Sequence, residues 1–385
     1  MKLFEDKPRT DNKPAKYLDN IFDFYDRSNQ PQFVPIRQTL NLWFERYPQE
    51  EKKELFARFK KSFSSAFYEL FLHELFTKQG FSLLPHPEVP GTSKRPDFLV
   101  SGNGIEFYLE ARESTDSSTL DQAAEKREAR LYDTINEIDS PNFFFRINKL
   151  EFLSNQQPAG RKIIPFIEKK LTGFDPDQVQ KLFDLVQDLE SLPIISYYDK
   201  DINLELSILP KSIEARGKDE IRPLAITQFK FSYEGSEDSI KKAVHKKAGK
   251  YGTPDKPYII SINSTSYKMT GKHDVFNALF GSEMISYSTN PSDRDLKLVR
   301  DTDGVFFGKR GPQYTRVSGI LITNVSSSNL HVANHWLVKH PFAQKDLNFD
   351  AFELSKIVVQ GSKIEHLSGA SIRETLEIEE DWLAK

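Results

Sequence analysis

The feature that most constrains the fold is an Asn-Gly dipeptide, Asn103-Gly104, between two short runs rich in apolar residues. A two-residue hairpin turn needs positive φ at both central positions, which asparagine and glycine adopt more readily than other residues. The turn fixes the pairing of the flanking strands, and counting outward from it places Asp97 directly opposite Glu110. The face opposite to the two acids carries Phe98, Val100, Ile105, Phe107, Leu109 and Ala111. This apolar layer belongs against a core.

Two acidic side chains that face each other across a hairpin repel, because their Cβ atoms lie about 4.5–5.5 Å apart. A divalent cation would compensate, since magnesium is commonly held by one or two carboxylates together with waters and phosphate oxygens. Arg95 or Arg112 could instead neutralise Asp97 and Glu110 in an ordinary surface sheet. The pairing alone leaves both interpretations open.

Hydrophobic periodicity predicts further helices and strands around this hairpin. The expected helices cover residues 33–47, 49–79, 120–138 and 163–171, and a lysine-rich helix covers 239–251. The expected strands cover residues 81–85, 97–101, 105–111, 192–198, 204–209, 224–231 and 257–263. Gly80 should end the second helix in the left-handed conformation. The first fifteen residues are charged and contain prolines, so we expect them to form a loosely held arm.

The order of these elements, with three short motifs, resembles the PD-(D/E)XK nuclease superfamily, whose fold is called restriction-endonuclease-like. The motifs are Glu69 on the helix that ends at Gly80, then Pro96-Asp97, and then Glu110-Ala111-Arg112. The resemblance covers less than a third of the chain. It implies a mixed α/β (α+β) fold whose core is a helix, a three-stranded meander, a second helix and a further strand, with a long insertion and an accessory C-terminal region.

The resemblance also sets the expected domain boundaries. These are an N-terminal helical region at 1–60, the first part of the nuclease core at 61–113, an insertion at 114–221, the second part of the core at 222–265 and the accessory region at 266–385. The implied function is metal-dependent hydrolysis of phosphodiester bonds with Mg²⁺ or Mn²⁺. DNA is the expected substrate, RNA is not excluded, and restriction or antiviral defence is the setting by analogy.

The resemblance assigns roles to particular side chains. Asp97 and Glu110 would hold the metal, while Glu69 would bind a second metal or orient waters, with Glu74 as its rival on the same helix. The lysine of the family motif is replaced by Arg112, which stays charged and can only orient and stabilise negative charge.

A lysine from elsewhere could replace the missing one. Lys247 and Tyr251 are spaced like the Gln-x-x-x-Tyr signature of one nuclease branch, with lysine in place of glutamine. Lys230 is a weaker substitute, and His86 precedes the hairpin and could border the cleft. For any single lysine, an ordinary basic helix face in solvent is the favoured explanation.

Two basic segments could contact nucleic acid. One is the lysine-rich helix with Lys246, Lys250 and Tyr251, and the other is segment 306–319 with Lys309, Arg310 and Arg316. Lysine and arginine meet phosphates, and tyrosine can stack on a base. A plain hairpin turn is the alternative for segment 306–319.

The composition limits which classes of function remain possible. The formal net charge of −3 gives no overall attraction to nucleic acid, so such a role must rest on a local patch. The chain has no cysteine, which excludes disulfides and thiolate chemistry and fits a cytoplasmic location. No segment is apolar enough for a membrane span.

The second function class that fits is a catalytically inactive nuclease-fold module that binds nucleic acid or a protein partner. A homo-oligomer is also compatible.

Overall fold

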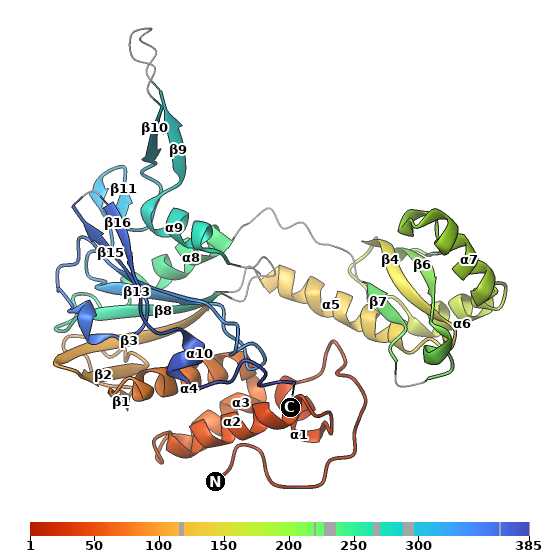
Figure 1. Ribbon diagram of the computed structural model, residues 1–385, viewed down its shortest axis with the longest axis horizontal. Helices are drawn as coiled ribbons and strands as arrows, with labels where there is room; N and C mark the ends of the chain where they lie inside the picture. The colour runs from red at the N-terminus through yellow and green to blue at the C-terminus, as the bar shows by residue number, and fades with distance from the viewer. Residues whose placement is uncertain are drawn as a thin grey trace. The chain divides into compact units, whose positions relative to one another are not determined.

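The computed structural model confirms a mixed α/β chain and describes residues 1–114, 119–218, 221–226, 236–264, 270–287, 296–361 and 363–384, without the side chains of 119–122. The chain forms two compact units (Figure 1). Unit 1 comprises Met1–Arg9, Ile21–Asp116 and Tyr233–Lys385, and unit 2 comprises Thr10–Asn20 and Ser117–Ser232. The predicted insertion at 114–221 and most of unit 2 therefore cover the same stretch of the chain.

Unit 1 is built on an eight-stranded mixed sheet, which runs in the order β1-β2-β3-β8-β13-β14-β15-β16. Its strands are β1 (Ser82–Pro85), β2 (Phe98–Gly102), β3 (Ile105–Ser114), β8 (Tyr258–Ser264), β13 (Gly319–Thr323), β14 (His335–Lys339), β15 (Lys356–Gln360) and β16 (Lys363–Leu367). β1, β2 and β3 form an antiparallel meander, and β8 pairs in parallel with both β3 and β13. Strands β13 to β16, in the expected accessory region, thus extend the same sheet.

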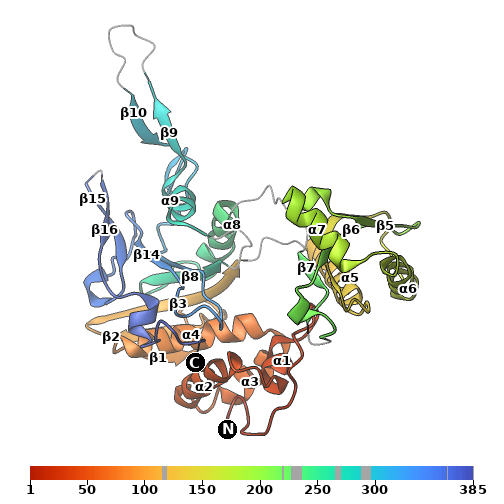
Figure 2. The ribbon, with the colours of Figure 1, turned by 45° about the vertical axis from the view of Figure 1, so that its right-hand side comes forward.

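Helices cover both faces of this sheet. They are α1 (Ile21–Arg27), α2 (Phe33–Arg46), α3 (Lys52–Lys61), α4 (Phe63–Lys78), α8 (Ser236–Ala248), α9 (Lys272–Phe280) and α10 (Ile372–Thr375), with a 3₁₀ turn η3 (Phe349–Ala351). α4 packs against β1 and β3 on the face of Phe107, whereas α8 packs against β3 and β8 on the face of Tyr108 (Figures 1 and 2). β3 is therefore buried from both sides.

The sequence of α4 follows from its double burial. One side of the helix meets the sheet and the other meets α2 and α3, so it is apolar nearly all round. The helix predicted over 49–79 with little interruption is two helices, because Ser62 leaves the helical region with φ −146° and ψ 65° and separates α3 from α4. Gly80 has φ +85°, which confirms the predicted left-handed cap.

The prediction of a loosely held N-terminal arm was also wrong for its first residues. Leu3 and Phe4 are buried, and Phe4 stacks on Phe22 with ring centroids 4.9 Å apart. The side chain of Asn41 on α2 accepts a hydrogen bond from the Phe4 N–H at 2.8 Å and donates one to its carbonyl at 2.9 Å. The side chain of Asn41 thus provides the two hydrogen bonds that a neighbouring strand would provide to the backbone of Phe4. These bonds hold the start of the chain against α2.

Unit 2 has its own four-stranded sheet, in the order β5-β6-β4-β7. Its elements are α5 (Thr119–Asn136), β4 (Phe143–Phe152), α6 (Gly160–Leu171), α7 (Pro176–Val186), η1 (Leu189–Ser191), β5 (Ile194–Tyr198), β6 (Ile202–Pro210), η2 (Ile213–Ala215) and β7 (Leu224–Ile226). Residues of α5 and α6 and the strands share a separate apolar core. Tyr17 and Leu18 belong to this unit, since their backbone N–H groups bond to the carboxylate of Asp133.

Two small hairpins complete unit 1. They are formed by β9 (Glu283–Ser286) with β10 (Lys297–Arg300), and by β11 (Phe307–Gly308) with β12 (Gly311–Pro312). Over the described ranges, no helix has both the length and the apolar character that a membrane crossing requires.

Candidate functional site

The site is organised by the β2–β3 hairpin, whose predicted turn and register are confirmed. Asn103 has φ +50° and Gly104 has φ +77°, and the pairs run from Gly102 with Ile105 out to Phe98 with Leu109. The next position outward on each strand is that of the two acids. The carboxylate of Asp97 also accepts a hydrogen bond of 2.6 Å from the N–H of Ala111, which orients it toward β3.

Glu110 is the most enclosed acid of this hairpin, with 1% of its side chain exposed. Lys247 on α8 donates to its Oε1, and Lys250 just after α8 donates to the same oxygen at 2.7 Å. The hydroxyl of Tyr251 donates to Oε2 and lies 3.0 Å from the carbonyl oxygen of Arg95. One carboxylate thus binds three side chains that lie about 140 residues further along the chain.

The connection between β3 and β8 explains this convergence. The two strands are parallel neighbours, with Glu110 beside Ile260, so the chain must cross over one face of the sheet between them. α8 lies in that crossover and packs on β3 and β8. The end of α8 therefore reaches the Glu110 end of the hairpin.

The charges of the site are unbalanced at Asp97. Burial and the nearby charge of Glu110 raise the pKa of Asp97 to about 6, and the negative charge of Glu69 adds to this, whereas the Ala111 N–H and Lys247 oppose it. Burial and the charge of Glu110 likewise raise the pKa of the Tyr251 hydroxyl, which stays protonated as a donor. Asp97 therefore binds a proton more readily than an exposed aspartate does.

Glu69, on α4, belongs to the same cluster. Its Oε1 accepts a hydrogen bond of 2.7 Å from the Tyr47 hydroxyl, and its Oε2 pairs with Arg58 at 2.6 Å. The negative charge of Glu69 helps to raise the pKa of Asp97, and the negative charge of Asp97 helps to raise the pKa of Arg58. The pKa of Arg58, which burial alone would lower, is raised by Glu69.

Sequence reasoning missed Tyr47 and Arg58. Both precede the resemblance to the nuclease core, and a tyrosine before a proline or an arginine in a basic helix carries no signal for a site by itself. Their role follows from α3 packing on α4, which turns Arg58 toward Glu69.

Glu74 lies away from this cluster. It is fully buried, pairs with Arg46, and is acted on by the charges of Lys78 and Glu377. Burial raises its pKa, and in the described structure its Oε2 has no hydrogen-bond partner. The structure therefore brings Glu69 rather than Glu74 to Asp97.

The remaining predicted residues near the hairpin make fewer contacts with the two acids. Arg112 lies two residues beyond Glu110 on β3, and within the described residues it forms no hydrogen bond or ion pair with either hairpin acid. The backbone N–H of His86 donates to the carbonyl of Asp97 at 3.0 Å, and His86 has φ +49°. Lys230 lies outside the described residues.

The predicted nucleic-acid contacts differ in exposure: Lys246, Lys309, Arg310 and Arg316 lie on the surface, Lys250 is half-buried, and Tyr251 is buried with its hydroxyl on Glu110, so its ring is not free to stack on a base. Lys246 is exposed on α8, and Lys309 and Arg310 form the exposed turn of the β11–β12 hairpin. Arg316 is exposed after this hairpin. Tyr314, in the same segment, hydrogen-bonds to His245 of α8, so the basic turn is tied to the helix that carries Lys247.

The two hairpin carboxylates are the candidate ligands for a metal ion. Nowhere in the described ranges do three or more His, Asp or Glu side chains gather closely enough to form a metal cage. Asp97 and Glu110 provide two carboxylates side by side, and burial together with the charge of Glu110 raises the pKa of Asp97. Two carboxylates suffice for magnesium, which keeps several waters and takes phosphate oxygens as further ligands. The residues fit such an ion.

Comparison of the chain with protein-family models, curated proteins and solved structures finds no significant match.

Proposed function

We propose that the chain is a metal-dependent nuclease that hydrolyses phosphodiester bonds, with DNA as the expected substrate. The single observation that carries the proposal is the contact of Lys247 with Glu110 beside Asp97. The family motif places a lysine beside the two hairpin carboxylates. In this sequence Arg112 stands at the position of that lysine. Lys247 supplies it from α8.

The order of elements supports the same proposal. α4, the β1–β2–β3 meander, α8 and then β8 beside β3 follow one another as helix, meander, helix and strand. This is the order implied by the resemblance to the PD-(D/E)XK superfamily. Fold alone does not define an activity, so the proposal rests on the side chains that these elements bring together.

Each side chain has a defined task in the proposed reaction. Asp97 and Glu110 would hold magnesium, which when bound polarises the scissile phosphate and lowers the pKa of its water. Tyr251 and Lys250 hold the Glu110 carboxylate in place. The ammonium of Lys247 stabilises negative charge on the phosphate or orients the attacking water.

Glu69 would act near Asp97, whose pKa its charge helps to raise. Tyr47 and Arg58 fix both of its oxygens, so its carboxylate keeps one orientation. In that orientation it would accept a hydrogen bond from water near Asp97. Arg58 also places a guanidinium near the acids, where it can pair with a phosphate oxygen.

The test is cleavage of supercoiled plasmid, single-stranded DNA and RNA with Mg²⁺, with Mn²⁺ and with a chelator. Wild type should cut only with metal, and Asp97→Ala should lower the rate at least about 100-fold. Glu106→Ala is the matched control, because Glu106 is an exposed acid on the same strand and face as Glu110. Equal metal-dependent cutting by wild type and Asp97→Ala would refute the proposal.

A second candidate is a nuclease-fold module that binds nucleic acid without cutting it. The observation in its favour is that three donors already occupy the Glu110 carboxylate, as in a salt-bridged structural site. Retention of DNA without cleavage, with the same affinity in Glu110→Gln, would support this candidate over the enzyme.

A further inference from the structure

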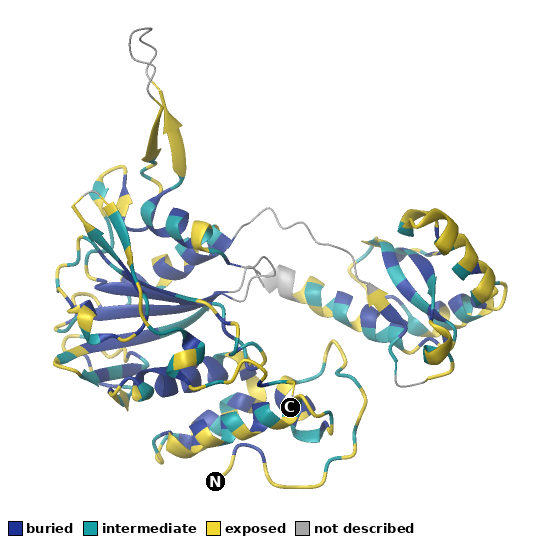
Figure 3. Cartoon of the chain, viewed as in Figure 1, coloured by how far each residue is buried: buried dark blue, intermediate teal, exposed yellow. Residues whose placement is uncertain are grey.

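The β9–β10 hairpin projects from unit 1 as an arm (Figure 1). Within the described chain its strands pair only with each other, as Glu283 with Arg300, Met284 with Val299, Ile285 with Leu298 and Ser286 with Lys297. Nearly all of its residues are exposed (Figure 3). An isolated two-stranded hairpin is marginally stable in water, so an arm of this kind gains stability from a partner.

One face of the arm is apolar. Because side chains alternate, Ile285 and Leu298 share a face with Tyr287 and Leu296, the next pair outward. These four side chains are exposed by 64%, 70%, 69% and 70%. Four large apolar residues in adjacent positions form a contiguous patch, and such patches mark interaction sites.

The base of the arm holds it in a fixed direction. Arg300 donates to the carbonyl of Gly281 at 2.6 Å and pairs with Glu283 at 2.6 Å. Asp303 accepts hydrogen bonds from the N–H and the hydroxyl of Ser282, both at 2.8 Å. Gly281 has φ +97°, and a Cβ there would clash with the carbonyl of Asp301, so only glycine fits this junction.

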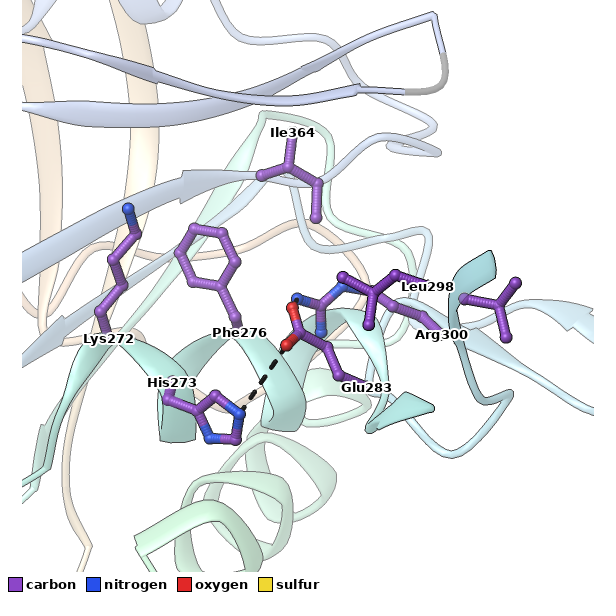
Figure 4. A pocket seen from close by; sticks show the side chains of 8 residues that line it. Lys272, His273, Phe276, Glu283, Leu298, Arg300 and Ile364 are labelled. Atoms are coloured by element: carbon purple, nitrogen blue, oxygen red, sulfur yellow. Dashed lines mark hydrogen bonds and ion pairs between the residues drawn. The ribbon is translucent and has the colours of Figure 1, made fainter. Parts of the chain in front are cut away.

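A pocket of about 740 Å³ opens at the foot of the same face (Figure 4). It is lined by Lys272, His273, Phe276, Glu283, Leu298, Val299, Arg300 and Ile364. Glu283 and Arg300 neutralise each other as an ion pair, and the remaining walls are apolar except for Lys272 and His273. A pocket of this composition suits apolar side chains.

The apolar side chains of the patch suit the pocket, but the patch and the pocket lie on the same face of the β9–β10 arm. Four residues along the strands separate the Glu283–Arg300 pair from Tyr287 and Leu296, a distance of about 14 Å. One molecule cannot fill its own pocket with these side chains. Two copies related by a twofold axis, with their arms antiparallel, bring the outer side chains of each arm over the pocket of the other.

We propose that the β9–β10 arm is a dimerisation arm, which packs face to face with the arm of a second copy of this chain. Tyr287 and Leu296 of each copy enter the pocket at the foot of the other arm. The contact uses the same patch twice, which doubles the area buried by each copy toward the roughly 1,000 Å² that a specific interface needs. The proposal is independent of the proposed nuclease activity.

The first test is the oligomeric state of the full chain, measured by sedimentation over a range of concentrations. Wild type should be a dimer, and Ile285→Lys should raise the dissociation constant at least about tenfold, since it places two charges at the centre of the contact. Leu185→Lys is the matched control, because Leu185 is 83% exposed on α7 in unit 2 and should leave the dimer intact. A wild type that stays monomeric, or a dimer that Ile285→Lys leaves unchanged, would overturn the proposal.

The second test uses the absence of cysteine from the chain. Two variants, Leu296→Cys and Ile364→Cys, carry tags of different size and are mixed with a short bismaleimide. A mixed cross-linked dimer is expected, whereas Leu296→Cys mixed with Leu185→Cys should give none. Absence of the mixed product would overturn the arrangement. A monomer whose binding to DNA is abolished by Ile285→Lys would also overturn it and assign the arm to nucleic acid.

Discussion

Replacing Asp97 with asparagine should make the folded protein more stable at neutral pH when no metal is present. Burial and the charges of Glu110 and Glu69, opposed by Lys247, raise the pKa of Asp97 from 3.8 to about 6. A pKa raised by about two corresponds to about 3 kcal/mol of unfavourable free energy in the ionised folded state. Allowing for its partial exposure leaves about 2 kcal/mol. Asparagine keeps an oxygen for the Ala111 N–H without this charge.

The pH dependence has a definite sign. Below about pH 3 Asp97 is protonated in both the folded and the unfolded chain, so wild type and Asp97→Asn should be equally stable. As the pH rises from about 3 to above 6, the unfolded chain loses this proton first, and the wild type loses stability relative to the variant. The difference should reach its full size at pH 7.

The assay is urea unfolding in a chelator at several pH values, repeated with magnesium. Magnesium should stabilise the wild type and not the variant, since only the folded wild type offers both carboxylates. Glu106→Gln is the control, because the hydrogen bond from Lys256 lowers the pKa of Glu106 and its replacement should not stabilise. A destabilised Asp97→Asn, or a difference that does not change with pH, would refute the reasoning.

Three further predictions test other parts of the molecule. Lys247→Met should lower the cleavage rate about 100-fold without changing the fold, whereas exposed Lys246→Met should have little effect; equal loss in both would point to general attraction for nucleic acid. Gly80→Ala should cost about 1 kcal/mol in urea unfolding because of φ +85°, and an unchanged midpoint would contradict this. Asn41→Ala should cost about 1–2 kcal/mol and speed proteolysis before Phe4, since both of its bonds to that backbone are lost; wild-type resistance to protease would show that the apolar contacts of Phe4 suffice.

Local chemistry made part of the site predictable. Asn103 and Gly104 admit the backbone angles that a tight hairpin needs, and the two-residue period of a strand then fixes the position of Asp97 opposite Glu110. The role of Gly80 follows in the same way, because its left-handed conformation depends on its own lack of a side chain. Such features depend on a few neighbouring residues, so they can be read along the chain.

The contacts that complete the site depend on the packing of distant elements. Lys247 meets Glu110 because β8 pairs with β3 and α8 crosses the sheet between them, a pairing set by the burial of whole faces. Arg58 meets Glu69 because α3 packs on α4. The sequence by itself determined the two carboxylates and their register, since these follow from backbone angles. Only the tertiary structure decided which charged side chains surround them, because it sets which distant faces come together.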